Sequence, residues 1–393
     1  MRISRTLRDA LAAAGEDQIV FDLDAVEESH ARLLRDLPGV AVRFAVKACP
    51  VDEVLDALAG GGAGFDTAGL GEIRQALRTG AAPDVIHYGN AVKSDRDIGI
   101  AHRLGIRDFA TDSVADVRAV AEHAPGARVF CRISTSGAGA LWGLQGKNGC
   151  SVPEAVTVLE TARDRGLVPA GLSLHVGSQQ MSTAAWRAAA DDLAHAIALL
   201  RRRGIRLDHV NLGGGLPALG YLDRRGVPLR PPIDGILAEI RDGVGRLRRV
   251  AGTPLEFVLE PGRHLVADHG AIRAHVVRLT ARRQRFGRRP HWLYLSCGKF
   301  NGLYEMDQLQ YRLEFPGHRG GPTVPAVIAG PTCDSDDAFD AGHPMLVPAD
   351  LRSGDPVWIL AAGAYSVSYR TVGFNGFDPL PHRAVRAHLP ALR

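Results

Sequence analysis

Lysine is scarce in this chain of 393 residues, because only four of its 47 basic residues are lysines and the rest are arginines. A primary amine can condense with an aldehyde to form a Schiff base, which a guanidinium cannot do. Lys47 ends a short apolar run (44–48), whereas Lys93, Lys147 and Lys299 lie beside glycines or polar turns. This distribution predicts an enzyme that keeps at least one lysine for its amine, as the attachment point of a cofactor.

Cysteine is also infrequent, and long apolar runs are missing. The five cysteines are odd in number, far apart and without a CxxC pair, so we expect neither a disulfide framework nor a metal site. Residues 1–18 lack a sustained apolar stretch, and no segment approaches the length of a membrane span. These absences predict a cytoplasmic protein that does not contact a membrane.

A strong excess of one charge is absent as well. The formal net charge is only +4, and acidic residues are interspersed with the arginines. The run 201–203 could contact nucleic acid, but no nucleic-acid-binding motif accompanies it. We therefore interpret it as a solvated helix end and expect no nucleic-acid partner.

Short apolar strands alternate with helical segments between about residues 40 and 260. Helical periodicity marks 72–78, 115–123, 153–163 and 184–202. Eight such units favour a (β/α)₈ barrel of the TIM type over an open doubly wound sheet. The expected strands are 42–45, 64–67, 85–88, 108–111, 129–133, 171–174, 209–212 and 256–259.

A second domain is expected after the barrel, because the segments beyond residue 265 look like strands separated by Gly and Pro turns. The strand candidate 18–22 precedes the barrel and is expected to join this later sheet. We thus predict a barrel over 23–268. A β-sandwich or β-barrel domain would comprise 1–22 and 269–393.

Unusual polar residues gather at the carboxyl ends of the expected strands, which is where barrel enzymes place their active sites. Random placement would scatter such residues between both ends of the barrel. The residues that follow or end strands are Lys47, Asp66, Arg132, His175, Gly213 to Gly215 and Glu260. Their grouping predicts a functional site on this rim.

Each rim residue also has a structural alternative. Asp66 could cap the following helix, and His175 could be a satisfied core histidine. Gly213–Gly215 could form only a tight turn, since the segment NLGGGLP is not a dinucleotide-binding fingerprint. Glu260 could pair with Arg263. Only the clustering on one rim favours function.

The combined rim matches the needs of pyridoxal phosphate. Lys47 supplies the amine, and His175 supplies a flat imidazole face. Backbone N–H groups of Gly213–Gly215, with the hydroxyl of Ser178, could cradle a phosphate. The carboxylate of Glu260 could keep a ring nitrogen protonated.

The chain resembles the fold-type III, alanine-racemase-like decarboxylases of basic amino acids that use pyridoxal phosphate, and is most similar to the bacterial ornithine decarboxylases. The resemblance runs nearly end to end. Any one of its motifs is weak, but all ten in this order are specific. They are FAVKA (44–48), GFDTAGLGEI (64–73), YGN (88–90), LHVGSQQ (174–180), NLGGG (211–215), LEPGR (259–263), GKFNGL (298–303), AGPTCDSDD (329–337), GAYS (363–366) and FNGF (374–377).

The resemblance implies a role for each cofactor-binding residue. Lys47 would hold the cofactor covalently and assist proton transfer, with Asp66 on the lysine side of the site. His175 would stack on the ring, Glu260 would pair with its nitrogen, and Arg132 would approach its 3-hydroxyl side. The remaining cofactor-binding residues, most of them for the phosphate, would be Ser178, Gly213, Gly214, Gly215, Gly262, Arg263 and Tyr365.

The resemblance also implies a homodimer with its active sites at the interface. Cys333 and Asp334 would come from the other subunit. Cys333 would reprotonate the substrate Cα after CO₂ leaves, and Asp334 would bind the distal amine of the substrate. Phe374 would line the site. From the residues alone, Cys333 could be an ordinary thiol and Asp334 part of a solvated acidic turn.

The segment 296–313 departs from the pattern of the bacterial relatives, in a region where such enzymes contact the substrate side chain. Ser296 replaces an expected aspartate, and Glu305 and Asp307 are available carboxylates there. We include Glu305 among the candidate substrate-binding residues.

The resulting hypothesis is a decarboxylase that converts L-ornithine to putrescine for polyamine biosynthesis, with lysine as the second substrate. One alternative is a decarboxylase of a modified or uncommon amino acid in a specialised pathway. A racemase would need a second acid or base at Cα, against which the GPTCD motif speaks. A non-catalytic regulatory homologue is disfavoured by the intact Lys47, His175, Glu260 and Cys333.

Overall fold

A computed structural model describes residues 3–143, 146–282, 289–318 and 320–387. Contacts divide the chain into two compact units. The barrel unit comprises Glu27–Pro217 and Pro231–Gly262, and the β unit comprises Met1–Val26, Ala218–Arg230 and Arg263–Arg393. The limits 23–268 for the barrel, and 1–22 with 269–393 for the β domain, stay a prediction from sequence.

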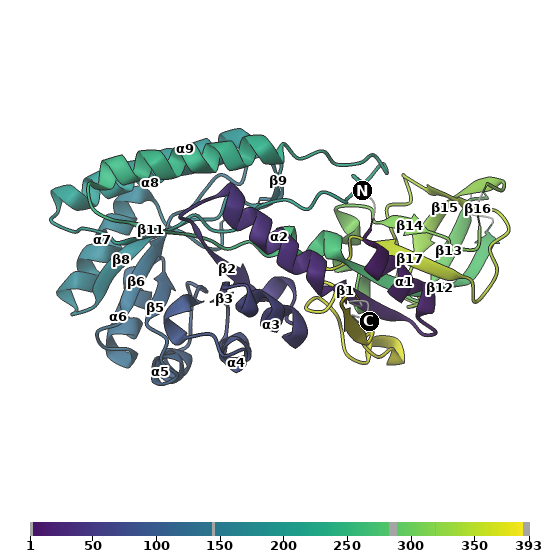
Figure 1. Ribbon diagram of the computed structural model, residues 1–393, viewed down its shortest axis with the longest axis horizontal. Helices are drawn as coiled ribbons and strands as arrows, with labels where there is room; N and C mark the ends of the chain where they lie inside the picture. The colour runs from purple at the N-terminus through teal and green to yellow at the C-terminus, as the bar shows by residue number, and fades with distance from the viewer. Residues whose placement is uncertain (1–2, 144–145, 283–288, 319, 388–393) are drawn as a thin grey trace, which may run out of the picture. The chain divides into compact units, whose positions relative to one another are not determined.

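The barrel unit contains a closed barrel of eight parallel strands, several of which are labelled in Figure 1. Strand β11 pairs with β2 and closes the ring. In chain order the strands are β2 (Ala41–Ala45), β3 (Gly64–Thr67), β4 (Ile86–Tyr88), β5 (Asp108–Thr111), β6 (Arg128–Arg132), β8 (Val168–Ser173), β10 (His209–Asn211) and β11 (Glu256–Leu259).

Helices connect these strands, as a parallel barrel requires. Three of them begin at serine N-caps: Ser94, Ser113 and Ser151 each accept a hydrogen bond from the backbone N–H three residues on. The two longest helices run side by side in Figure 1. The connecting helices are α3 (Asp52–Gly60), α4 (Leu70–Arg78), α5 (Asp95–Arg103), α6 (Val114–His123), α7 (Val152–Asp164), α8 (Thr183–Arg202) and α9 (Ile233–Ala251), and α2 (Leu23–Asp36) precedes β2.

The β unit is built around β12 (Gly270–Ala281), which pairs with β1 (Gln18–Asp22), β13 (His291–Leu295) and β17 (Pro356–Leu360). The N-terminal strand therefore joins the later sheet, and the predicted barrel with a C-terminal β domain is confirmed. Helix α1 (Arg5–Ala13) packs Leu7 and Leu11 against this sheet. The other strands are β14 (Arg312–Glu314), β15 (Thr323–Ala329), β16 (Met345–Pro348) and β18 (His382–Val385).

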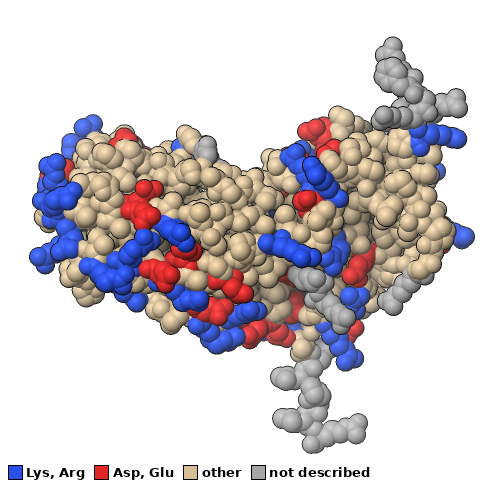
Figure 2. Space-filling view, turned by 90° about the horizontal axis from the view of Figure 1, so that it is seen from above, with Lys and Arg blue, Asp and Glu red and all other residues tan. Residues whose placement is uncertain are grey.

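Acidic side chains lie among the basic ones on the face seen in Figure 2. On the two long helices, for example, Arg246 donates to Asp191 at 2.5 Å and Arg187 pairs with Glu239. Among the described residues, no helix is both long and apolar enough to cross a membrane.

Candidate active site

Lys47 lies immediately beyond β2, in a single 3₁₀ turn (Val46–Ala48). Its neighbours along the chain from Val42 to Cys49 are all buried, whereas the Lys47 side chain is 46% exposed. The local structure therefore presents one amine at the carboxyl end of the barrel. Its Nζ lies 3.8 Å from Oδ2 of Asp66.

Asp66 is a buried carboxyl group on β3, and its Oδ1 has no hydrogen-bond partner among the described residues. A Cβ on Gly89 would lie only 1.8 Å from that oxygen, so glycine is needed in the YGN motif. Burial, together with the charge of Glu260, raises the pKa of Asp66 to about 7. Asp66 can therefore hold or release a proton beside the amine of Lys47 near neutral pH.

His175 follows β8 and is half-buried, and its ring is held by its own loop. Nδ1 accepts a hydrogen bond from the backbone N–H of Gly177 at 3.0 Å. Thr135 donates to the backbone oxygen of His175 at 2.6 Å. Burial lowers the pKa of His175 to about 3, helped by the charges of Lys47 and Arg132. The imidazole is therefore neutral at physiological pH and suited to stacking rather than to acid catalysis.

The triple-glycine turn after β10 has no room for side chains. A Cβ on Gly213 would lie 1.9 Å from the backbone oxygen of Leu174, and one on Gly215 would lie 2.6 Å from that of Gly177. Gly213 and Gly215 also have positive φ angles of 69° and 116°. A Cβ on Gly214 would reach 3.4 Å from Nε2 of His175. Glycine thus leaves a cradle of backbone beside the imidazole.

Glu260 lies just beyond β11 and is tied to the same turn. Its backbone N–H donates to the carbonyl of Gly213 at 2.8 Å, and the side-chain amide of Asn211 donates to Oε1. Asn211 Oδ1 in turn accepts from the N–H of Gly213 at 2.8 Å. Asn211 thereby fixes the glycine turn and the carboxylate relative to each other.

Two further candidates complete the barrel rim. Arg132 ends β6, and its positive charge acts on the pKa values of both Asp66 and His175. Gly262 approaches the lysine turn so closely that a Cβ there would lie 2.7 Å from Cβ of Ala48. Ser178 starts the short strand β9 (Ser178–Gln180), in which Gln180 N–H donates to Gly215 O at 3.0 Å. The barrel unit thus gathers its predicted residues around one rim.

Lys93 is another amine of the barrel unit. Its Nζ donates to the carbonyls of Asn90, Ala91 and Ala110 at 2.8, 3.0 and 2.5 Å. Burial lowers the pKa of Lys93 to about 8. Three carbonyl partners give Lys93 a structural role, because they tie the loop after β4 to strand β5.

In the β unit, Arg263 lies in a buried cluster. Its guanidinium donates to both carboxylate oxygens of Glu305, at 2.5 and 2.6 Å, and to the hydroxyl of Tyr221 at 3.0 Å. The ring of Tyr365 lies 4.7 Å from Arg263 Cζ, and Tyr365 has a positive φ of 63°. Because both oxygens of Glu305 accept from Arg263, a substrate amine would have to compete with a buried guanidinium for that carboxylate.

Cys333 and Asp334 are both exposed, on a loop of the β unit. The backbone N–H of Cys333 donates to Asn375 Oδ1 at 2.9 Å. The loop is also held by the buried Asp337, which accepts from the N–H and hydroxyl of Thr332 at 3.0 and 2.6 Å and from Lys299 N–H at 2.7 Å. The thiol of Cys333 and the carboxylate of Asp334 thus lie on a loop that hydrogen bonds hold in place.

Phe374 is placed beside this loop by the same motif that supplies Asn375. Its ring lies 4.6 Å from that of Phe300, which belongs to the GKFNGL motif. Tyr365 and Tyr304 both contact the ring of Tyr369, at 5.1 and 4.9 Å. In the β unit, the candidate residues Phe374 and Tyr365 are therefore both packed against other aromatic rings.

Sequence reasoning missed several residues that hold the candidates in place: Asn211, His87, Asn375 and Asp337. Three of them stood inside quoted motifs and His87 directly before one, yet nothing in the sequence indicated what they bind. The alternation of polar and apolar residues on β4 could have marked His87 as facing the barrel interior.

The barrel rim fits pyridoxal phosphate on its own geometry. It offers an exposed amine, a backbone cradle that any Cβ would fill, a neutral imidazole and two carboxyl groups, one of which has an oxygen without a partner in the described part of the chain. Fold and rim together define a barrel enzyme that carries an aldehyde cofactor on a lysine.

Comparisons with known proteins agree with that class. The model of the "pyridoxal-dependent decarboxylase, pyridoxal binding domain" family matches residues 23–267. A lysine/ornithine decarboxylase of Selenomonas ruminantium is 31% identical over 366 residues, covering 92% of this chain and 88% of the relative. A diaminopimelate decarboxylase of Zymomonas mobilis is 27% identical, covering 92% and 86%.

A solved structure is similar as well. The lysine/ornithine decarboxylase of Vibrio vulnificus, complexed with putrescine, superposes with a TM-score of 0.81 at 26% identity, covering 96% of each chain. The chain belongs to the pyridoxal-dependent decarboxylase family. It is an enzyme that uses pyridoxal phosphate to decarboxylate basic amino acids.

Proposed function

We propose that this enzyme decarboxylates L-ornithine to putrescine, with L-lysine as its second substrate, as a cytoplasmic step of polyamine synthesis. The single observation that best supports the chemistry is the rim itself, where Lys47 lies 3.8 Å from Asp66 beside the glycine cradle. The named relatives support the substrate. The Selenomonas protein carries lysine and ornithine in its name, and the Vibrio structure contains putrescine, the diamine that ornithine yields.

Each rim residue would contact a different part of the cofactor. Bound pyridoxal phosphate supplies an aldehyde for the amine and an electron-withdrawing ring that stabilises the carbanion left by CO₂. Lys47 would hold the aldehyde and release it to the substrate amine, and Asp66 would exchange a proton with Nζ of Lys47. His175 would pack on the ring as a neutral imidazole, and Arg132 would lie toward its hydroxyl. Glu260 would keep the ring nitrogen protonated.

The phosphate would be bound by backbone N–H groups of Gly213, Gly214 and Gly215 and by the hydroxyl of Ser178. Gly262, Arg263 and Tyr365 stay predicted partners of the same cofactor. The bidentate contact of Arg263 with Glu305 keeps that guanidinium charged and orders it in advance.

Two exposed residues of the β unit would act on the substrate. Cys333 Sγ would deliver a proton to Cα after CO₂ departs, and Asp334 would pair with the distal ammonium group. The family resemblance implies that these residues come from a second subunit, so we propose a homodimer with shared sites. Phe374 would line the substrate channel. Glu305 stays a predicted substrate contact, although Arg263 occupies both of its oxygens.

The substrate assignment is tested by measuring CO₂ release from ornithine, lysine, arginine and diaminopimelate. We expect the largest kcat/KM with ornithine and the second largest with lysine. Asp334→Asn should raise KM for ornithine more than it lowers kcat, because it removes the charge that binds the distal amine. Turnover of diaminopimelate alone would reject both the substrate and the role of Asp334.

Shared sites are tested by mixing two variants, Lys47→Ala, which should be inactive, and Cys333→Ala, which should keep the cofactor but release the diamine slowly or wrongly protonated. In a dimer whose sites draw on both chains, each mixed dimer has one intact site, so equal mixing should restore about one quarter of wild-type activity. Each variant alone gives the baseline. No recovery in a mixture that exchanges subunits would place Cys333 in its own chain's site or outside the mechanism.

A second candidate is the decarboxylation of a modified or uncommon amino acid. It is favoured by one observation: the divergent segment 296–313 commits Glu305 to Arg263. Poor turnover of all four common substrates, with a cofactor fully attached to Lys47, would support this candidate over ornithine.

A further inference from the structure

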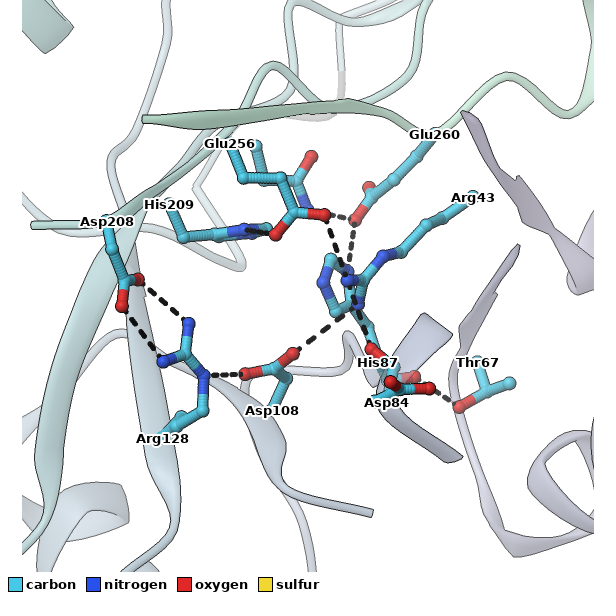
Figure 3. A network of polar contacts seen from close by, with 11 residues as sticks. Arg43, Thr67, Asp84, His87, Asp108, Arg128, Asp208, His209, Glu256 and Glu260 are labelled. Carbon is cyan, nitrogen blue, oxygen red and sulfur yellow. Dashed lines mark hydrogen bonds and ion pairs between the residues drawn. The ribbon is translucent and has the colours of Figure 1, made fainter. Parts of the chain in front are cut away.

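The interior of this barrel is unusually polar. Barrel cores of this type are normally filled by branched aliphatic side chains. Here Arg43, His87 and His209 point inward from β2, β4 and β10, as the close view in Figure 3 shows. Arg43 pairs with Asp108 and Glu256 at 3.5 and 3.6 Å, so most of this polarity is locally compensated.

His87 is the least satisfied of the three, since Arg43 and His209 each have only one nitrogen, Nη1 and Nε2, without a hydrogen-bond partner among the described residues. Its side chain is fully buried, and neither ring nitrogen has a hydrogen-bond partner among the described residues. Its ring packs between Phe130 at 4.8 Å and His209 at 5.1 Å, centroid to centroid. A buried polar atom without a partner is destabilising by about 1–3 kcal/mol, so such an atom calls for an explanation.

One acceptor lies just beyond hydrogen-bonding reach. Nδ1 of His87 is 3.9 Å from Oε1 of Glu260, the oxygen that already accepts from Asn211. Catalytic hydrogen bonds are often long without substrate and shorten in the loaded enzyme. A shift of about 1 Å would complete this one.

The His87 ring is neutral, so it can donate one hydrogen bond. Burial, with the charges of Arg43, His209 and Arg128 nearby, lowers the pKa of His87 well below its ordinary value. The ring is therefore neutral and carries a single N–H. The other ring facing it, His209, directs Nδ1 to Glu256 at 3.2 Å and does not compete for Glu260.

We propose that His87 is a positioning residue for Glu260: its Nδ1–H donates to the carboxylate from inside the barrel and fixes it for the ring nitrogen of the cofactor. Asn211 and His87 would then hold Glu260 from two strands, β10 and β4. This inference rests on the role of Glu260 in the proposed function, and it adds a residue that acts only through Glu260.

The test compares cofactor affinity, measured by fluorescence titration of cofactor-free enzyme, among substitutions at His87. His87→Leu removes the donor and should weaken affinity about tenfold, the effect of one lost hydrogen bond to a charged group. His87→Asn places an amide near the position of Nδ1 and should stay within about twofold of wild type. His87→Gln places its amide nearer the position of Nε2 and should behave like His87→Leu. This Asn and Gln pair decides the question even where the leucine variant does not fold.

A purely structural role is separated by a packing control. Phe130→Leu disturbs the packing against the His87 ring without removing a polar atom. It should lower the melting temperature but leave cofactor affinity and the visible absorbance of the lysine-bound cofactor unchanged. If Phe130→Leu and His87→Leu lower stability alike and neither changes affinity or absorbance, His87 is only packing and the inference is overturned.

The dependence on Glu260 is tested in the same assay. Glu260→Gln should weaken affinity and shift the visible absorbance, and adding His87→Leu to it should change affinity by less than about twofold, because both act through one carboxylate. A further tenfold loss in the double variant would overturn the inference. If Glu260→Gln alone had no effect, the proposed role of Glu260 would fail first. If Glu260→Gln weakened cofactor affinity but His87→Leu did not, the inference about His87 would fail while the role of Glu260 would remain.

Discussion

Asp66 in the barrel unit and Asp337 in the β unit are both buried carboxyl groups, but their surroundings differ. Asp66 has an oxygen with no hydrogen-bond partner among the described residues, and its pKa rises to about 7. Asp337 accepts three hydrogen bonds from Lys299 and Thr332. The comparison teaches that a buried carboxyl group with an unpartnered oxygen is available for proton transfer. A buried carboxyl group whose oxygens all accept hydrogen bonds serves to hold a loop in place.

The same contrast separates the charged groups of the two units more generally. The barrel rim keeps Lys47 exposed and His175 neutral, so that both can meet a cofactor. The β unit instead pairs Arg263 with Glu305 and fastens the loop of Cys333. The predictions below test whether this division between reactive and positioning groups holds.

The largest effect is expected for Lys47, the reactive amine of the barrel rim. Lys47→Ala should lower kcat by at least about 10⁴-fold, because no other group can hold the aldehyde. The melting temperature of the cofactor-free protein should change little, since the side chain is half exposed. Activity is measured by CO₂ release. Lys93→Ala is the matched control, and a comparable loss there without unfolding would move the attachment site.

The next largest effect concerns the buried ion pair of the β unit. Glu305→Leu leaves Arg263 buried without its partner and should lower the free energy of unfolding by about 3–5 kcal/mol. The double variant Glu305→Leu/Arg263→Met should recover most of that loss, since neither charge remains. Urea denaturation of the cofactor-free protein measures both. Equal losses in the single and double variants would show that packing, rather than charge, is decisive.

The third prediction concerns the pH dependence of stability. The pKa of Asp66 is about 7 in the folded state and 3.8 as an ordinary carboxyl, so between these values the folded protein binds more protons than the unfolded one. Stability from this group is therefore lost as pH rises from about 4 to about 7. Asp66→Asn should make the cofactor-free protein more stable than wild type by about 2–4 kcal/mol at pH 8, but not at pH 4.

The exposed Asp56 on α3 offers the control for that experiment. Asp56→Asn should leave the pH dependence of the melting temperature as in wild type. If Asp66→Asn shows a constant difference from wild type across pH 4 to 8, Asp66 is not held partly protonated, and the contrast with Asp337 disappears.

The smallest effect is expected at the loop of the β unit. Asp337→Asn replaces an acceptor of three hydrogen bonds by an amide that must point a donor at one of them, which should cost about 1–3 kcal/mol. The thiol of Cys333 should also react faster with a neutral thiol reagent as its loop loosens. The exposed Asp336, whose carboxylate is 3.4 Å from Lys299, is the control. Asp336→Asn should change stability by less than about 1 kcal/mol.

Much of the fold could be predicted from sequence, because parallel strands buried on both faces appear as short apolar runs. All eight barrel strands were expected within three residues of their observed limits. Strand β8 starts at Val168, three residues before the expected start, because Pro169 interrupts the strand pattern and Val168 is exposed. Strand β4 starts after a 3₁₀ turn that includes Val85.

The candidate site could be predicted where it depends on position along a strand, but not where it depends on contacts between distant segments. Lys47, Asp66 and Glu260 were expected because the carboxyl ends of barrel strands meet at one rim. The pairing of Arg263 with Glu305 joins residues 42 apart, and no periodicity signals it. The position of His87 behind Glu260 likewise follows only from closure of the barrel.

The central claim is that Lys47, alone among four lysines, carries the cofactor. Reduction of the loaded enzyme with borohydride fixes the cofactor to its lysine, and peptide mass spectrometry then identifies that residue. We expect the phosphopyridoxyl group on the peptide that contains Lys47 and on no other. The same group on Lys93, Lys147 or Lys299, or no modified lysine in enzyme that binds the cofactor, would contradict this account.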